Sequence, residues 1–274
     1  MRTDSSSSLS GQVALVTGAG RGIGRAVALE LASHGASVVL TDIEAPLESS
    51  QIVAGETGAT TLALAMDVTN REAVAQACDE ARQALGPVSI LVNNAGLQTP
   101  VAGDLHELPS DLMERMLSVH VVGASLVASA LIPGMRERRY GRIVNLSSVI
   151  GLVGLQRRTP YSTAKAAIAG LTRGLALENG RHGVTVNAVA PGYTLTDILK
   201  DKVSAGTLNY ELFAERAAVG RWAQPWEIAR VIRFLAEPDS GFITGVVWEV
   251  DGGYACNGNP GENIGPLAPF NSAL

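Results

Sequence analysis

The stretch Val13-Ala-Leu-Val-Thr17, followed at once by Gly18-Ala-Gly-Arg-Gly-Ile-Gly24, decides the fold class. An apolar run that stops at glycines is typical of a strand buried on both faces, as in parallel sheets. Residues 25–34 then carry apolar residues at helical spacing. Glycines let the backbone approach a pyrophosphate, and the helix N-terminus offers free N–H groups. This order predicts a dinucleotide-binding unit, with an ordinary tight turn as the alternative because the spacing departs from GxGxxG.

The next apolar run, Ala36–Asp42, ends in an acid that lies 18 residues beyond Gly24. A carboxylate about 20 residues after the glycine loop binds the adenosine ribose 2′-OH of NAD and repels the 2′-phosphate of NADP. Asp42 therefore favours NAD over NADP, although a solvated acid at a strand end is the simpler alternative. Arg21 in the loop complicates this preference, since a guanidinium there could bind a 2′-phosphate.

Apolar runs and helical patterns alternate along the rest of the chain. We expect further strands at residues 60–67, 88–92, 141–146, 184–190 and 243–250, and helices at residues 44–56, 71–85, 109–131, 160–179 and 225–235, with a break at Pro133-Gly134. This alternation predicts α/β architecture: a single Rossmann-like, doubly wound parallel sheet of about seven strands with helices on both faces. Residues 194–219 form a long insertion of mixed character.

Composition narrows the functional class. Of 274 residues, 46% are hydrophobic and 17% charged, and the net charge is -5, which suits a globular protein with small-molecule partners rather than nucleic acid. Cys78 and Cys256 lack CxxC spacing, so we expect no disulfide and no metal site, and a reducing, cytoplasmic location.

The two ends of the chain are expected to be irregular. Residues 1–8 are rich in serine without the apolar segment of a signal peptide, and we expect a disordered lead. Residues 9–274 are expected to form one dinucleotide-binding and catalytic domain, with an irregular tail at 255–274. No apolar run reaches about 18 residues, so no membrane partner is expected.

Tyr161 and Lys165 lie four residues apart in the segment predicted to form the 160–179 helix. Residues at this spacing share one helix face, and an ammonium there would favour the phenolate form of the tyrosine. A free tyrosine titrates near 10, so a lowered pKa would suit Tyr161 to exchange a proton with an alcohol. Taken alone, the pair is more often two residues on a solvated face.

Together these motifs resemble the short-chain dehydrogenase/reductase family over about residues 9–254. The resemblance depends on six motifs in order: Thr17-Gly18-x-x-x-Gly22-x-Gly24, Asp67-Val68, Asn93-Asn-Ala-Gly96, Ser148, Tyr161-x-x-x-Lys165 and Pro191-Gly192-x-x-x-Thr196. Any one motif is weak, whereas all six in this order are specific.

The resemblance implies a role for each motif. Tyr161 would be the acid/base, Lys165 would lower its pKa and bind the nicotinamide ribose, and Ser148 would hold the substrate oxygen. The implied cofactor-binding residues are Gly18, Gly20, Arg21, Gly22, Ile23, Gly24, Asp42, Asp67, Val68, Asn93, Ala95, Gly96, Tyr161, Lys165, Pro191, Gly192, Thr194 and Thr196. The resemblance also implies homo-tetramers or homo-dimers, and closure of residues 194–219 over the substrate.

One position departs from the family pattern. Val119-His120-Val-Val-Gly123 places a histidine where the family usually has a catalytic asparagine that holds a water in a proton relay. A histidine keeps the main-chain carbonyl, and its ring can donate and accept hydrogen bonds. Three outcomes are open: a tolerated substitution, a relay that includes His120, or impaired catalysis.

The expected function is NAD-dependent hydride transfer between a secondary alcohol (a polyol, sugar or hydroxy compound) and its ketone. An NADPH-dependent 3-oxoacyl-[acyl-carrier-protein] reductase shares all these motifs, and Arg157 and Arg158 could serve a phosphopantetheine arm, although solvated loop charges are the simpler interpretation. A non-catalytic NAD(H)-binding sensor is the third alternative, favoured only by His120.

Overall fold

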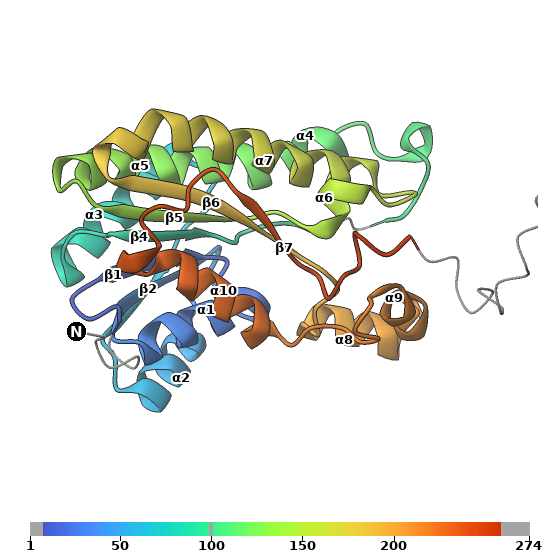
Figure 1. The fold of residues 1–274 in the computed structure, drawn as a ribbon, viewed down its shortest axis with the longest axis horizontal. Helices are drawn as coiled ribbons and strands as arrows, with labels where there is room; N and C mark the ends of the chain where they lie inside the picture. Colours follow the sequence, from blue (N-terminus) through green and yellow to red (C-terminus); the bar gives the residue numbers. More distant parts are fainter. Residues whose placement is uncertain (1–7, 99–100, 259–274) are drawn as a thin grey trace, which may run out of the picture.

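The computed structural model describes residues 8–98 and 101–258, which surround one parallel sheet (Figure 1). Within these residues the strand order is β3-β2-β1-β4-β5-β6-β7. The strands are β1 (Val13–Thr17), β2 (Ser37–Asp42), β3 (Thr61–Ala65), β4 (Ile90–Asn93), β5 (Gly141–Leu146), β6 (Val184–Pro191) and β7 (Val247–Val250). The predicted α/β class and parallel sheet are confirmed. The ends of β1 to β6 lie within two residues of the predicted ends, whereas β7 begins four residues later than expected.

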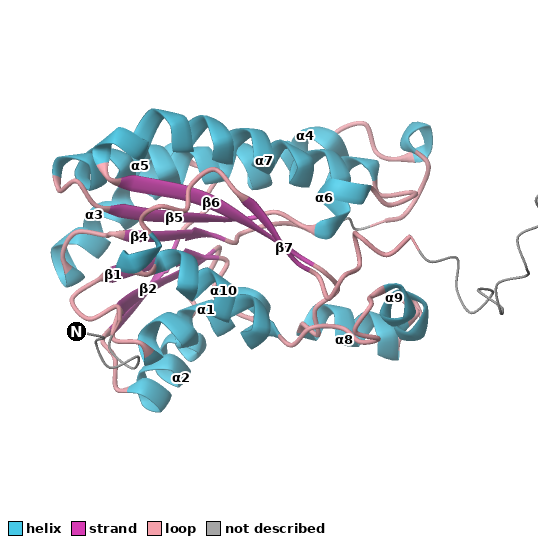
Figure 2. Cartoon of the chain, viewed as in Figure 1, coloured by secondary structure: helices cyan, strands magenta, loops and turns pink. Residues whose placement is uncertain are grey.

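Helices cover both faces of the sheet (Figures 1 and 2). One face carries α1 (Gly22–Ser33), α2 (Leu47–Thr57) and α10 (Pro225–Ala236); the other carries α3 (Arg71–Leu85), α4 (Leu112–Leu117), α5 (Ala124–Glu137) and α7 (Thr159–Asn179). Side chains alternate along a strand, so Ala14 and Val16 pack in the core beneath α1 and α10, while Val13 and Leu15 pack beneath α3 and α5. A central strand therefore needs apolar residues at every position.

The connections from β1 and β4 position the site. These strands are neighbours, yet α1 leaves β1 toward one face and α4 and α5 follow β4 on the other. Such a reversal opens a crevice outside the carboxyl ends of the strands, where open α/β sheets bind ligands. The polar motifs predicted to follow β1, β4, β5 and β6 all lie at this end.

The predicted helix break at Pro133-Gly134 is wrong, because α5 continues through Pro133 to Glu137. Pro133 is exposed, whereas Leu131, Ile132 and Met135 are buried and hold both sides of the proline on the core. The packing of this face outweighs the one hydrogen bond that a proline cannot donate.

The helical stretch Leu112–Glu137 is also long and apolar enough to cross a membrane, by length and composition only. About 44% of the most apolar 18-residue part of this stretch is buried inside the domain, where α5 packs on α3 and β5. Core helices of α/β proteins meet the same criteria.

The ends and the insertion are more ordered than expected. Ser8 donates a hydrogen bond to Glu237 at 3.0 Å and Leu9 is fully buried, so the predicted disordered lead does not include Ser8. The insertion contains two helices, α8 (Asp197–Ser204) and α9 (Tyr210–Arg216), beyond the strand ends. Residues 1–7 and 259–274, which hold the rest of the lead and most of the tail, lie outside the described residues.

Candidate active site

The glycine loop between β1 and α1 is a tight turn in which Gly18 and Gly24 have no room for a side chain. Gly18 has φ +62°, and a Cβ there would lie 2.8 Å from Ala95 Cα; a Cβ on Gly24 would lie 2.2 Å from Gly18 O. Asn94 Nδ2 holds the turn by donating to Thr17 O at 2.9 Å and Gly18 O at 2.8 Å. Helix α1 begins at this turn without a side-chain cap, so its first N–H groups are available to an anion.

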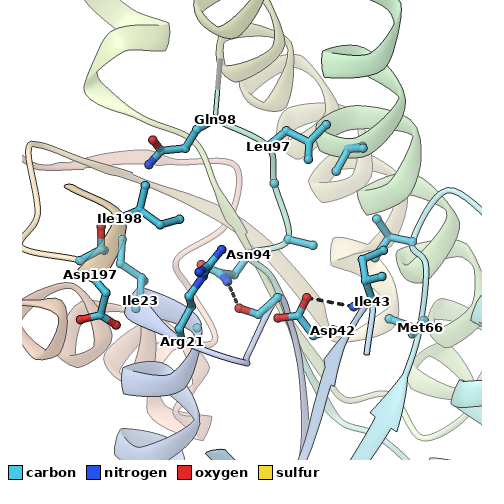
Figure 3. Close-up of a pocket in the computed structure, with 18 of the residues that line it drawn as sticks. Arg21, Ile23, Asp42, Ile43, Met66, Asn94, Leu97, Gln98, Asp197 and Ile198 are labelled. Atoms are coloured by element: carbon cyan, nitrogen blue, oxygen red, sulfur yellow. Dashed lines mark hydrogen bonds between the residues drawn. The ribbon is translucent and has the colours of Figure 1, made fainter. Parts of the chain in front are cut away.

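A cavity of about 290 Å³ opens over this turn (Figure 3). Most of the residues predicted to bind the cofactor line it, namely Gly18, Arg21, Gly22, Ile23, Gly24, Asp42, Asp67, Val68, Ala95, Gly96 and Thr196. The uncapped helix and the glycine cradle fit a dinucleotide pyrophosphate, which is the group that the resemblance implies.

Gly20 and Asn93 were predicted to bind the cofactor, but neither is among the described residues that line the cavities. The Gly20 N–H already donates to Asp42 Oδ2 at 3.0 Å. Asn93 is buried, and its Nδ2 donates to Asn145 Oδ1 at 2.9 Å and to Ala124 O at 3.3 Å. Asn93 thus joins β4 to β5, because a strand's last residue still points into the sheet's packing layer.

Asn94 is the cofactor-site residue that sequence reasoning passed over. It lines the cavity and braces Gly18, as described above. The signal was present in the repeated amide of Asn93-Asn94: one amide must point into the packing layer and the next toward the crevice.

Asp42 and Arg21 both extend into the cavity drawn in Figure 3. Asp42 is partly exposed, and its second oxygen, Oδ1, accepts from Ile43 N at 2.9 Å. Each carboxylate oxygen can accept more than one hydrogen bond, so Asp42 retains acceptor capacity for a ribose hydroxyl. Arg21 is exposed at the same cavity, which keeps a cation within the site.

Ser148, Tyr161, Lys165 and His120 all line a second cavity of about 190 Å³. Pro191, Gly192, Thr194 and Thr196 complete its wall, as predicted for the nicotinamide end. The second cavity shares Ile23, Asn94, Gly96, Leu97, Gln98 and Thr196 with the first, so the two form adjoining parts of one crevice.

Two elements bring the predicted catalytic side chains together. Ser148 follows β5 and caps α6 (Val149–Val153) by accepting from Ile150 N at 3.2 Å. Tyr161 lies in the first turn of α7, and Lys165 lies one turn further. Helix α6 approaches α7 so closely that a Cβ on Gly151 would lie 2.6 Å from the Lys165 carbonyl carbon.

The predicted effect of Lys165 on Tyr161 is not found in this structure. Burial raises the pKa of Tyr161, and only the hydrogen bond with the Ser148 hydroxyl lowers it. Lys165 Nζ instead donates to Leu146 O at 2.7 Å and lies 5.8 Å from the Tyr161 ring centroid. Burial lowers the pKa of Lys165 to about 7, since its ammonium is poorly solvated.

His120 lies in a π-helical segment, Ser118–Gly123, between α4 and α5. Its Nε2 is 3.1 Å from Leu97 N and 3.0 Å from Leu97 O, and its ring meets Tyr161 edge-on at 5.6 Å between centroids. Nδ1 is buried without a partner among the described residues. Burial and then the charge of Lys165 lower the pKa of His120 to about 3, so the ring is neutral at pH 7.

A third cavity of about 420 Å³ shares Ser148 and Tyr161 with the second. Residues of helices α8 and α9 form one side of it. Tyr193 and Phe213 stack there at 4.3 Å between centroids. The tyrosine and serine therefore stand between a compartment for the cofactor and one of small-molecule size.

Comparisons with known proteins agree with this geometry. A family model described as Enoyl-(Acyl carrier protein) reductase matches residues 18–255. The chain is 37% identical to the cis-4-hydroxycyclohexanecarboxylate dehydrogenase of Sinomonas cyclohexanicum (89% of this chain, 96% of the relative) and 38% identical to the 3-oxoacyl-[acyl-carrier-protein] reductase FabG of Pseudomonas aeruginosa (90% and 98%).

Among solved structures, a candidate 2-deoxy-D-gluconate 3-dehydrogenase from Agrobacterium tumefaciens with bound NADP superposes with a TM-score of 0.83 at 31% identity, covering 93% of this chain and 100% of that one. The order of the strands, the glycine turn and the cavity lined by Ser148, Tyr161 and Lys165 agree with the assignment that these relatives give. The chain belongs to the short-chain dehydrogenase/reductase family.

Proposed function

We propose that this oxidoreductase uses NAD to interconvert a secondary alcohol and its ketone, with Tyr161 as the group that exchanges the proton. The family supports an oxidoreductase acting on hydroxyl and ketone groups with NAD(P)(H). The observation that carries the finer proposal is that Ser148 and Tyr161 line both the catalytic cavity and the adjoining cavity of small-molecule size.

When bound, the nicotinamide ring would accept or donate the hydride. The chain's own residues handle the proton. In oxidation, the Tyr161 phenolate oxygen accepts the hydroxyl proton while the Ser148 hydroxyl donates a hydrogen bond to the substrate oxygen as charge develops there. In reduction, the Tyr161 phenol returns that proton. The buried Lys165 amine stands one helical turn behind the phenol.

The preference for NAD rests on Asp42. Its carboxylate lines the adenosine end of the crevice, where a 2′-phosphate would meet a negative charge at short range. Arg21 lines the same cavity, and its guanidinium could bind a 2′-phosphate. We therefore expect some activity with NADP as well.

The reductase alternative retains one specific support, since FabG proteins match this chain along nearly its whole length. A non-catalytic NAD(H) sensor has less support, because a sensor has no need of a serine, tyrosine and lysine gathered at one cavity. His120 does not favour it either, since the ring is fixed at the cavity wall rather than blocking the tyrosine.

We also propose a cytoplasmic homo-tetramer or homo-dimer. Support comes from the β7 edge of the sheet, where Phe234 and Trp248 pack edge-on yet are 38% and 41% exposed, and Phe242 is fully exposed. Such an apolar patch beside an edge strand is suited to bind a second copy. Light scattering of the purified protein tests this; a monomer at micromolar concentration would contradict it.

The functional proposal is tested with a panel of secondary alcohols, sugars, polyols and 3-oxoacyl thioesters, each assayed with both NAD(H) and NADP(H). We expect turnover of an alcohol–ketone pair with a higher kcat/KM for NAD. Tight NAD(H) binding with no turnover across the panel would instead favour the sensor.

A further inference from the structure

The third cavity, which leads to Ser148 and Tyr161, has a cationic wall. Arg157, Arg158 and Lys202 all line it. No aspartate or glutamate is among the described residues that line this cavity. A cavity with three cations and no acid has a positive potential that acts on whatever enters it.

Two of these cations have no carboxylate partner in the described part of the chain. Arg157 Nη2 donates to Ala102 O at 3.3 Å, and Lys202 Nζ donates to Gln98 Oε1 at 2.7 Å. Both partners are neutral, and neither cation is found in an ion pair with a described residue. These hydrogen bonds orient the two side chains but do not neutralise their positive charges.

Arg158 lies close enough to Lys202 to interact with it electrostatically. Burial and then the charge of Arg158 lower the pKa of Lys202, and Arg158 also acts on Tyr193 across the cavity. Like charges gathered at one wall repel each other, and an anion placed among them would relieve that repulsion.

Much of the rest of the wall is apolar, beside the polar side chains of Gln98, Gln156, Thr207 and Asn209. Side chains of Leu155, Leu199, Leu208, Leu212 and Phe213 line the cavity together with the Tyr193 ring. The wall therefore suits a molecule that has an apolar body and one anionic end.

We propose, on the basis of the proposed function, that the substrate is an anionic alcohol or ketone whose carboxylate or phosphate group pairs with this cation cluster while its reacting oxygen lies at Ser148 and Tyr161. The carboxylate could belong to a compact hydroxy or keto acid, and the phosphate to a phosphopantetheine thioester. A cavity of about 420 Å³ accommodates the whole of a small acid.

The experiment compares anionic probes with neutral matches that react at the same carbon. The first arm uses 4-oxocyclohexanecarboxylate and 4-oxopentanoate against their methyl esters. The second uses acetoacetyl-phosphopantetheine against acetoacetyl-pantetheine. The readout is the ratio of kcat/KM for the anion to that for its neutral match. It is measured for the native chain, for Lys202→Met, for Arg157→Gln and for Lys200→Met.

Lys200→Met is the matched control, because Lys200 lies on the same helix as Lys202 but pairs with Asp197 and does not line the cavity. We expect the native enzyme to favour the anion by about tenfold or more in at least one arm, as a charge-assisted contact gives. Lys202→Met and Arg157→Gln should lower that ratio severalfold, and Lys200→Met should not.

The proposal would be overturned by anion-to-neutral kcat/KM ratios near one in both arms, or by ratios that Lys202→Met and Arg157→Gln leave unchanged. If no probe and no member of the alcohol panel turns over, the proposed function fails separately. Calorimetric binding of the two acids then decides: weaker binding in Lys202→Met than in Lys200→Met supports the anion site, and equal binding excludes it.

Discussion

Lys165 shows how burial changes the chemistry of a single side chain. Its spacing from Tyr161 predicts an ammonium that stabilises a phenolate, yet the structure places Nζ on a backbone carbonyl with its pKa lowered to about 7. Spacing fixes which helix face two residues share, whereas the pKa depends on the density of atoms around them. Sequence reasoning could therefore identify Tyr161 and Lys165 but not their protonation states.

The pH dependence of the reaction follows from Tyr161. Burial raises the pKa of its phenol, so the phenolate needed for oxidation increases only as pH rises into the alkaline range. Reduction needs the phenol, which persists through neutral pH. We expect kcat/KM for oxidation to rise with pH above 7 while that for reduction stays level, as measured from pH 6 to 10.

At Asp42, removal of the charge alone should change the cofactor preference. Asp42→Asn keeps an oxygen that can accept from Gly20 N but no longer repels a 2′-phosphate, and Arg21 remains nearby. We expect the ratio of kcat/KM for NADP to that for NAD to rise by about tenfold. Glu44→Ala, an exposed acid outside the cavity, is the control. An unchanged ratio in Asp42→Asn would contradict the assigned role.

At the scale of elements, His120 connects the π-helical segment Ser118–Gly123 to the loop after β4. The ring makes a hydrogen bond with the Leu97 backbone and fills the space beside Gly96, where a Cβ would lie 2.3 Å from His120 Cε1. The sequence shows that a histidine replaces the usual asparagine, but the π-helical turn and the fit against Gly96 are properties of packing that no spacing reveals. The same holds for Pro133, which a helix tolerates once its neighbours are buried.

Gly96→Ala tests this contact between elements. The methyl group would push the imidazole away from Leu97 and move the cavity wall, so kcat/KM should fall about tenfold or more. In a His120→Asn background, which has a shorter side chain, the same change should cost much less. Gly55→Ala, where a Cβ meets nothing within 4 Å, is the control. Additive effects of Gly96→Ala and His120→Asn would show that the two residues do not interact.

At the scale of the whole molecule, the alternation of strands and helices and the parallel sheet could be predicted from buried runs that end in polar motifs. The helices of the insertion at 194–219 could not be predicted; α9, for example, packs through an aromatic contact between Tyr193 and Phe213 that no periodicity reveals. The cation cluster of the third cavity likewise brings together two distant segments, since Arg157 and Arg158 are neighbours in the chain and Lys202 lies on α8.

Buried His120 also makes the stability of the whole fold depend on pH. Between pH 3 and 6.5 the unfolded chain protonates this imidazole, whereas the folded chain keeps it neutral. Protons therefore favour the unfolded state, and stability falls as pH decreases through that window. Urea unfolding at fixed protein concentration should show that His120→Asn loses about 2 kcal/mol less than the native chain between pH 6.5 and 5. Identical losses would mean that the imidazole is protonated in the folded state.

The central claim is that the Tyr161 hydroxyl exchanges the substrate proton. It is tested most directly by the turnover of Tyr161→Phe with the best alcohol–ketone pair from the panel, beside NAD(H) affinity measured by fluorescence titration. We predict that kcat falls at least about a thousandfold while the cofactor Kd changes little, because the ring is kept and only the oxygen is lost. Turnover near that of the native enzyme would contradict the claim.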